Sequence, residues 1–244
     1  MIVFIVNIKR ETLSGNKDNQ PDYSKFCINS WKKWAEKYNA EVVVLEEPFG
    51  NIEPHWYKAF PFQLLDHSEI NYQRIAVVDN DTIVHPNCPN FFDEVKEDEI
   101  GVVLDDTNFD WTIRSTDAYH KHVFEEFDRF DTFEYFNSGF LVLSKQHKKA
   151  YESVITFMKE NYEKLNWVQE KYGVGRDQTP LNFLLRKYAK VKHLSKRFNC
   201  QGLISKELIE PKKIEKMCYI SHYNAMPREY RYTLMEKVYN YLYE

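Results

Sequence analysis

Residues 74–84 have the sequence Arg74-Ile-Ala-Val-Val-Asp79-Asn80-Asp81-Thr82-Ile-Val84. Four apolar residues lead into Asp79, a pattern typical of a strand that is buried on both faces of a sheet. Open α/β sheets bind their ligands at the carboxyl ends of such strands. Asp79 and Asp81 are two residues apart and can project to one side, so their carboxylates suit a divalent cation such as Mg²⁺ or Mn²⁺ that is shared with a diphosphate. An acidic turn without a ligand is the alternative that these residues leave open.

Strand-like and helix-like patterns alternate on both sides of this stretch. The predicted strands are residues 1–8, 41–45, 74–79, 100–104, 140–143, 190–194 and 217–220. The predicted helices are residues 22–39, 55–66 with a late start or bend at Pro61, 87–96, 146–164, 177–188 and a last one from about 229. No repeat or linker divides the chain. We therefore predict one α/β domain over residues 1–244, with a mostly parallel central sheet flanked by helices.

The composition narrows the class of protein. Of the 244 residues, 43% are hydrophobic and 29% are charged, which is enough to bury a core. The longest apolar runs fall far short of the roughly 20 residues of a transmembrane helix, so no transmembrane segment is predicted. Lys and Arg number 33 against 37 Asp and Glu, and the net charge of −4 argues against nucleic acid as a partner.

The cysteines and the first residues indicate a reducing compartment. No two of the four cysteines, at positions 27, 88, 200 and 218, are close enough in sequence to suggest a zinc site or a redox motif. The apolar run from Ile2 precedes Lys9 and Arg10, which is the reverse of the order in a signal peptide. We therefore expect a cytoplasmic protein.

Glycine is scarce in this chain. Seven glycines in 244 residues are less than half the usual share of about 7%. None of them forms GxGxxG or GxxxxGK[ST], so the dinucleotide-binding fingerprint and the P-loop are excluded. A phosphate would have to be held by a metal, by side chains or by the start of a helix.

Two enzyme families share the sequence that starts at Asp79. In phosphatases of the haloacid dehalogenase type, DxDx[TV] supplies an aspartyl nucleophile and a second Asp as acid/base. Residues 79–82 match its first four positions, and Ile83 stands at the fifth. In glycosyltransferases of the GT-A fold, DxD holds the metal of a nucleotide-sugar. The phosphatase motif normally ends the first strand, whereas two predicted strands precede Asp79 here. The position of the motif after the third predicted strand therefore favours the glycosyltransferases. A non-catalytic protein that binds nucleotide-sugars is a third alternative.

Three further motifs follow in order along the chain. They are Phe136-Asn137-Ser138-Gly139 before an apolar strand, Asp177-Gln178 before Leu181-Asn182, and His222 after an apolar strand. Together with Asp79 and Asp81 they resemble glycosyltransferase family 8, the glycogenin and bacterial galactosyltransferase group, over residues 1 to about 230. The resemblance implies a GT-A fold and transfer of a hexosyl group from a nucleotide-sugar, a UDP-sugar above all. It further implies retention of the anomeric configuration, with a hydroxyl of a glycan, a lipid-linked or a protein acceptor as the acceptor group.

The resemblance also implies the roles of individual residues. Asp79, Asp81 and His222 would bind Mn²⁺ or Mg²⁺, and an imidazole with two carboxylates suits Mn²⁺. The catalytic residues would be Asn137, Asp177 and Gln178. Substrate contacts are expected from the resemblance at Asn7, Lys9, Lys58, Ser138, Gly139 and Arg228. Two more are expected from position: Asp106 at the ligand end of a strand, and Trp111 in the aromatic segment that follows.

Each of these residues has a structural alternative. Asp177 stands where a helix cap is expected, Lys58 could be a surface lysine, and Asn137 could belong to a turn before a strand. His222 could be a buried structural histidine. If the enzyme inverted the anomeric configuration instead, it would need a carboxylate base, and Asp105, Asp106 or Asp177 could supply it.

Residues 222–230 differ from the family motif HxxGxxKPW. Ala225 stands at the Gly, Arg228 at the Lys, Glu229 at the Pro and Tyr230 at the Trp. A positive charge is therefore kept at Arg228, while the other three positions depart from the pattern.

Residues 105–135 are polar and aromatic with weak periodicity, and they are long for a connection inside a domain. We expect them to form the acceptor side of the cleft, with Trp111 stacked on a sugar ring. The alternative is an extra helix with Trp111 in the core. This segment opens the predicted acceptor-binding half, residues 105–244, which follows a nucleotide-binding half at 1–104.

Overall fold

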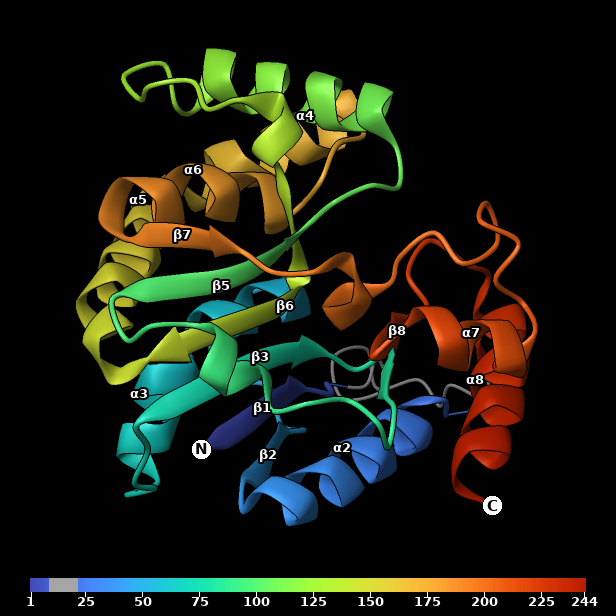
Figure 1. The fold of residues 1–244 in the computed structure, drawn as a ribbon. Helices are drawn as coiled ribbons and strands as arrows, with labels where there is room; N and C mark the ends of the chain where they lie inside the picture. The colour runs from blue at the N-terminus through green and yellow to red at the C-terminus, as the bar shows by residue number, and fades with distance from the viewer. Residues whose placement is uncertain (9–21) are drawn as a thin grey trace.

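The computed structural model describes residues 1–8 and 22–244 of the chain. Lys9, one of the predicted nucleotide contacts, lies outside the described residues. A six-stranded sheet forms the centre of the molecule (Figure 1), with the strand order β2-β1-β3-β6-β5-β7. The strands are β1 Ile2–Val6, β2 Glu41–Leu45, β3 Arg74–Asp79, β5 Glu99–Leu104, β6 Phe136–Ser144 and β7 Lys190–His193.

Five strands of this sheet run in one direction. β1 pairs with β2 and β3 in parallel, and β5 pairs with β7 in parallel. β6 is antiparallel to both of its neighbours, β3 and β5. The predicted mostly parallel sheet is confirmed.

Helices cover both faces of the sheet (Figure 1). They are α2 Ser24–Tyr38, α3 Pro61–His67, α4 Phe109–His122, α5 Lys148–Tyr172, α6 Gln178–Tyr188, α7 Pro211–Met217 and α8 Arg228–Tyr243. The 3-10 turns are η1 Pro54–Ala59, η2 Phe91–Glu94, η3 Thr132–Glu134, η4 Lys145–His147 and η5 Lys196–Asn199. Side chains alternate between the faces along each strand. Val3 of β1 and Val78 of β3 therefore pack on the side of α2, α7 and α8, whereas Phe4 and Val77 pack on the side of α3 to α6.

Helix α2 supports the Asp79–Asp81 turn from below the sheet. The indole N–H of Trp31, which is fully buried, donates to Oγ1 of Thr82 at 3.0 Å. Thr82 in turn donates to the carbonyl of Asp79 at 2.8 Å. A buried Trp contributes apolar contact area and one hydrogen-bond donor. These two hydrogen bonds therefore fix the position of the Asp79–Asp81 turn relative to α2.

Strand β6 begins at Phe136, four residues before the predicted start, so Asn137, Ser138 and Gly139 lie inside the strand. The expectation of a turn there was wrong, because these polar side chains find partners in a buried site that the apolar pattern does not reveal. The register with β5 shifts between Val102 and Val103, whose partners are Leu141 and Asn137. Such irregularities are common next to active sites, where they redirect side chains.

A separate two-stranded ribbon joins distant parts of the chain. β4, Thr82–Val84, pairs antiparallel with β8, Ile220–His222, with Thr82 opposite His222. The predicted strand at 217–220 was wrong, because Met217 still belongs to α7 and the pairing with β4 starts at Ile220. The ribbon brings His222 beside the aspartates of residues 79–81.

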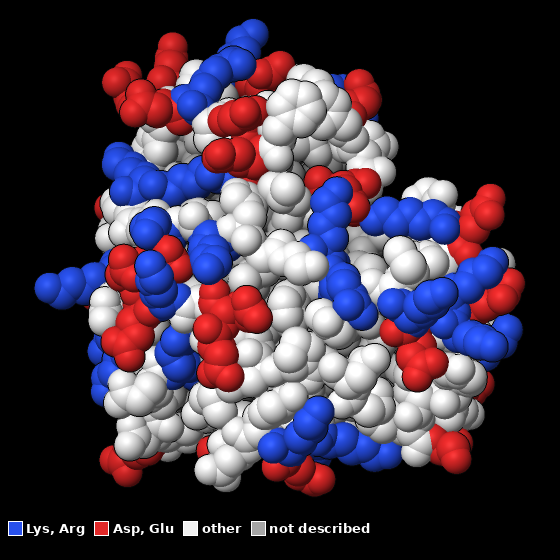
Figure 2. All heavy atoms as spheres, in the orientation of Figure 1, with Lys and Arg blue, Asp and Glu red and all other residues white. Residues whose placement is uncertain are grey.

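Helix α4 lies within the segment from 105 to 135, so the extra helix of the alternative is confirmed. Trp111 is half-buried, so the alternative that it belongs to the core was wrong. None of the helices in the described part of the chain has the length and apolar character needed to cross a bilayer. Figure 2 shows basic and acidic side chains interspersed over one face, without a continuous basic surface on it.

Candidate active site

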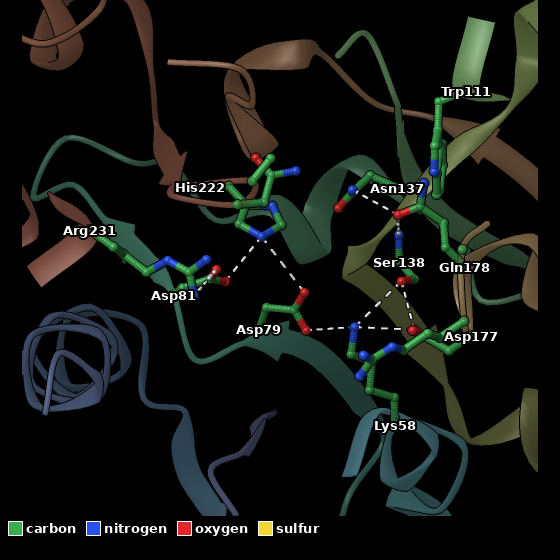
Figure 3. Close-up of a pocket in the computed structure, with 14 residues that line it drawn as sticks. Lys58, Asp79, Asp81, Trp111, Asn137, Ser138, Asp177, Gln178, His222 and Arg231 are labelled. Atoms are coloured by element: carbon green, nitrogen blue, oxygen red, sulfur yellow. Dashed lines mark hydrogen bonds and ion pairs between the residues drawn. The ribbon is translucent and has the colours of Figure 1, made fainter. Parts of the chain in front are cut away.

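A cavity of about 260 Å³ lies beyond the carboxyl end of β3. Figure 3 shows its lining from β3, β6, α6, β8 and α8. Of the predicted site residues, it brings together Lys58, Asp79, Asp81, Trp111, Asn137, Ser138, Asp177, Gln178 and His222.

Three potential metal ligands meet at one side of this cavity. Nε2 of His222 lies 3.1 Å from Oδ1 of Asp81 and 3.7 Å from Oδ2 of Asp79. One ligand atom from each of the three residues lies within 4.8 Å of the others. Gly139 faces them from β6, and a Cβ there would overlap the His222 ring and lie 2.7 Å from Oδ2 of Asp79. The close approach of β6 to this cluster therefore requires glycine.

Asp81 is ionised by its surroundings. Burial raises the pKa of its carboxyl, but His222 and Arg231 outweigh burial and lower the pKa to about 2. Nη1 of Arg231 lies 3.2 Å from Oδ2 of Asp81 and also donates to the Tyr23 hydroxyl at 3.0 Å. Nη2 of Arg231 donates to the carbonyl of Met226. The guanidinium is thus fixed at the edge of the metal cluster.

Lys58 is buried between two carboxylates. Its Nζ lies 2.6 Å from Oδ1 of Asp79 and 3.2 Å from Oδ2 of Asp177. Burial opposes the charge of Lys58, but Asp177 and Asp79 outweigh it, and the pKa of Lys58 is raised. Lys58 likewise overcomes the effect of burial on Asp177 and lowers the pKa of that carboxyl. The surface position considered for Lys58 was wrong, since only 8% of the residue is exposed.

Asp177 directs its carboxylate into the cavity. It is the N-cap residue of α6, yet its side chain makes no capping hydrogen bond. Instead Oδ2 accepts a hydrogen bond from Oγ of Ser138 at 2.8 Å. The structural cap considered for Asp177 was wrong, and its charge is available to the cavity.

Asn137 and Gln178 interact directly. Nδ2 of Asn137 donates to Oε1 of Gln178 at 2.9 Å, and Nε2 of Gln178 donates to Oδ2 of Asp105 at 2.7 Å. Oδ1 of Asp105 accepts from the backbone and hydroxyl of Thr107. Both oxygens of Asp105 therefore have partners.

Trp111 forms another wall of the cavity. A Cβ on Gly175 would lie 2.7 Å from the Trp111 ring, so glycine allows the indole to lie against the backbone there. The ring also meets Tyr135 edge to face, with centroids 6.3 Å apart. In Figure 3 Trp111 and Arg231 lie on opposite sides of the cavity.

Four predicted substrate contacts in the described part of the chain, Gly139 and the three residues that follow, are not among the residues that line this cavity. Asn7 is buried, and its Oδ1 accepts from Nδ2 of Asn80 at 3.0 Å. Asp106 pairs with Lys206 at 2.7 Å and with Lys196 at 3.2 Å. The guanidinium of Arg228 lies over the Tyr23 ring, 5.9 Å from its centroid.

Sequence reasoning missed Arg231 and Asn199. Arg231 lines the cavity one helical turn after Arg228, and the signal that could have found it is a second arginine on the same helix face. Asn199 is 1% exposed and contacts Nδ1 of His222. A single asparagine between Phe198 and Cys200 offers no comparable signal.

Ala225 has a backbone conformation that favours glycine. Its φ is 54°, in the left-handed region, and it lines the cavity. The motif HxxGxxKPW has its Gly at this position. Ala225 therefore holds a left-handed conformation that glycine adopts more readily.

The model of glycosyl transferase family 8 matches residues 56–227. No curated protein matches this chain. Among solved structures, a glycosyltransferase involved in glycosylation of the major capsid of PBCV-1 is 12% identical, with a TM-score of 0.62 over 96% of this chain and 98% of that one. The bifunctional glycosyltransferase WbbM is 14% identical, with a TM-score of 0.54 over 97% of this chain and 49% of WbbM. At these identities the two structures show that the fold is shared.

Proposed function

Since the chain belongs to glycosyl transferase family 8, we propose that this glycosyltransferase uses a nucleotide-diphospho-sugar and a divalent metal, and that it transfers a hexosyl group to an acceptor hydroxyl with retention. The family match also decides against the phosphatase that shares the DxD sequence. A UDP-sugar is the first candidate donor. The observation that carries the proposal is the cluster of Asp79, Asp81 and His222 in the same cavity as Lys58 and Arg231.

The residues of the cluster fit a divalent ion such as Mn²⁺ or Mg²⁺. Neighbouring ligands of an octahedral ion with bonds of about 2.1 Å lie roughly 3 Å apart, and Nε2 of His222 is 3.1 Å from Oδ1 of Asp81. The lack of a side chain at Gly139 leaves room beside both His222 and Asp79. When bound, the ion would offset the charge that develops on the leaving diphosphate.

Two side-chain cations flank the cluster and suit the diphosphate. Lys58 contacts one oxygen of Asp79, whose other oxygen faces His222. Arg231 contacts the oxygen of Asp81 that faces away from His222. Charge-assisted hydrogen bonds from Lys and Arg to phosphate are strong. We assign to Arg231 the phosphate contact that the family motif gives to the position of Arg228.

The sugar and the acceptor would occupy the rest of the cavity. Asp177, Gln178, Asn137 and Ser138 offer acceptors and donors for sugar hydroxyls. Trp111 offers an apolar face for the acceptor. Retention requires no carboxylate base. Two of the three candidate bases, Asp105 and Asp106, are engaged by their own neighbours, which supports retention, and Asp177 faces the cavity.

The remaining parts of the proposal rest on the sequence. Residues 1–104 would bind the nucleotide, with Asn7 and Lys9 near its base and ribose, and residues 105–244 would bind the acceptor. The acceptor is a glycan, a lipid-linked or a protein hydroxyl. The spacing of the cysteines supports the cytoplasm as the compartment.

The test combines binding and turnover. Isothermal titration should show UDP binding that needs Mn²⁺ in the wild type and is lost in Asp81→Ala. Slow hydrolysis of one UDP-sugar, stopped by a chelator, should accompany it, and NMR of the earliest product should show the donor's own anomeric configuration. Binding without any turnover would instead favour the non-catalytic alternative, and an inverted product would contradict retention.

A further inference from the structure

An unbroken chain of side-chain hydrogen bonds runs from the metal cluster to Asp105. Nδ1 of His222 lies 2.9 Å from Oδ1 of Asn199, and Nδ2 of Asn199 donates to Oδ1 of Asn137 at 3.0 Å. From Asn137 the chain continues through Gln178 to Asp105, at 2.9 Å and 2.7 Å. We call these five residues the amide relay.

Backbone donors fix the direction of the relay. The N–H of Ser138 points at Oε1 of Gln178 at 3.3 Å, and the N–H of Gly139 points at Oδ1 of Asn137 at 2.8 Å. A backbone N–H can only donate, so both of these side-chain atoms must be oxygens. The amide nitrogen of Gln178 then faces the carboxylate of Asp105, which accepts. The amide orientations of Asn137 and Gln178 thus follow from the strand and from Asp105.

The orientation of Asn199 follows from that of Asn137. Because Oδ1 of Asn137 is an acceptor, the group of Asn199 that meets it must be the NH₂ group. The carbonyl oxygen of Asn199 is then turned toward His222, and an oxygen can only accept. Asn199 is 1% exposed and His222 2%, so water does not compete for these bonds.

The consequence concerns the two ring nitrogens of His222. Nδ1 must carry a proton in order to donate to Asn199. Nε2, which faces Asp81 and Asp79, is therefore the nitrogen whose lone pair is left for a metal ion. Partners of the non-coordinating nitrogen of a metal-binding histidine orient the ring and set its tautomer.

We propose that Asn199 is a positioning residue, which holds His222 in the Nδ1–H tautomer with Nε2 directed at the cation. The relay connects this role to Asn137 and Gln178, so the metal ligand and the amides of the sugar site share one hydrogen-bonded framework. The proposal rests on the proposed function only in taking the cation to be a metal bound by His222.

The wild-type protein provides the first test. In protein labelled with ¹⁵N-histidine and saturated with diamagnetic Mg²⁺, long-range ¹H–¹⁵N spectra should show His222 with its proton on Nδ1 and none on Nε2. The ion is needed because, without it, Nε2 can donate to Asp81 at 3.1 Å. A dominant Nε2–H tautomer would overturn the proposal. This measurement needs neither a variant nor a nucleotide, so it gives its answer even if the protein binds no UDP and the proposed function fails.

Variants provide the second test. Asn199→Ala should lose the Nδ1–H preference and weaken Mn²⁺ binding, measured by EPR without nucleotide, by roughly 10- to 100-fold. Asn199→Asp keeps an acceptor for Nδ1–H and should retain the tautomer. The matched control is Asn182→Ala, because Asn182, on α6, is also a buried amide, and it bonds only to backbone groups of Phe136 and Gln178. Unchanged Mn²⁺ affinity in a folded Asn199→Ala, or an equal loss in Asn182→Ala, would refute the assignment.

Discussion

Replacing Arg231 by alanine separates a phosphate contact from a metal contact. Arg231 touches Asp81 but is not a metal ligand, and its guanidinium is held by Tyr23 and Met226 at the cavity wall. Without it, one oxygen of Asp81 loses its partner. The carboxylate then becomes a stronger ligand for a cation, since a neighbouring positive charge has been removed.

The expected magnitude follows from the type of bond that is lost. A hydrogen bond to a charged group contributes about 1.5–3 kcal/mol, and a tenfold change in affinity corresponds to about 1.4 kcal/mol. Arg231→Ala should therefore weaken binding of UDP in the presence of Mn²⁺ by roughly 10- to 150-fold. The affinity for Mn²⁺ alone should stay the same or rise.

Calorimetry with UDP, uridine and Mn²⁺ checks this expectation. Uridine lacks phosphate, so its affinity should not change in Arg231→Ala. Arg228→Ala is the matched control, since Arg228 lies one turn earlier on α8 and does not line the cavity. Equal losses of UDP affinity in the two variants, or a parallel loss of uridine and Mn²⁺ binding, would refute the assignment.

Three further predictions concern single residues. Ala225→Gly should stabilise the protein by about 0.5–1 kcal/mol, because relief of the left-handed alanine exceeds the added entropy of the unfolded chain; chemical denaturation measures it, and a loss of stability would contradict the backbone argument. Trp111→Ala should raise the acceptor KM while leaving Tm and donor hydrolysis near wild type, whereas Trp31→Ala, at a fully buried site, should cost about 3–5 kcal/mol. The pKa of Asp81 is lowered to about 2 from 3.8, so its ionised form stabilises the metal-free fold above about pH 4 and this contribution is lost as the pH falls toward 2. Unfolding midpoints of wild type and Asp81→Asn, measured in a chelator, should converge over that range, and a constant difference would contradict the pKa.

The sequence predicted best those elements whose pattern is local. β2 and β3 match their predicted bounds at 41–45 and 74–79, because each is a short run of mostly β-branched or apolar residues between polar ones. The ribbon of β4 and β8 has three residues on each side and exists only because the two segments meet. Its strands are too short for periodicity to mark, so β4 was not predicted and β8 was misplaced.

The same distinction applies to the site. The ligand edge of the sheet predicted that Asp79 would meet a ligand, and family motifs added His222 and Asp177. Arg231 and Asn199 depend on where α8 and η5 pack, which no local pattern states. Asp106 was predicted as a sugar contact from its place at a strand end, and that place alone did not show that Lys196 and Lys206 pair with it.

The charges of the cavity explain why metal and diphosphate should bind together. Three carboxylates, Asp79, Asp81 and Asp177, are already opposed by Lys58 and Arg231. A divalent ion alone would compete with these cations for the same oxygens, and a diphosphate alone would compete with the carboxylates for the same cations. Bound as a pair, the ion takes oxygens that Lys58 and Arg231 release, while the phosphates accept from those cations. Each ligand therefore removes the cost that opposes the other, and by linkage Mn²⁺ must raise the affinity for UDP by the same factor as UDP raises the affinity for Mn²⁺.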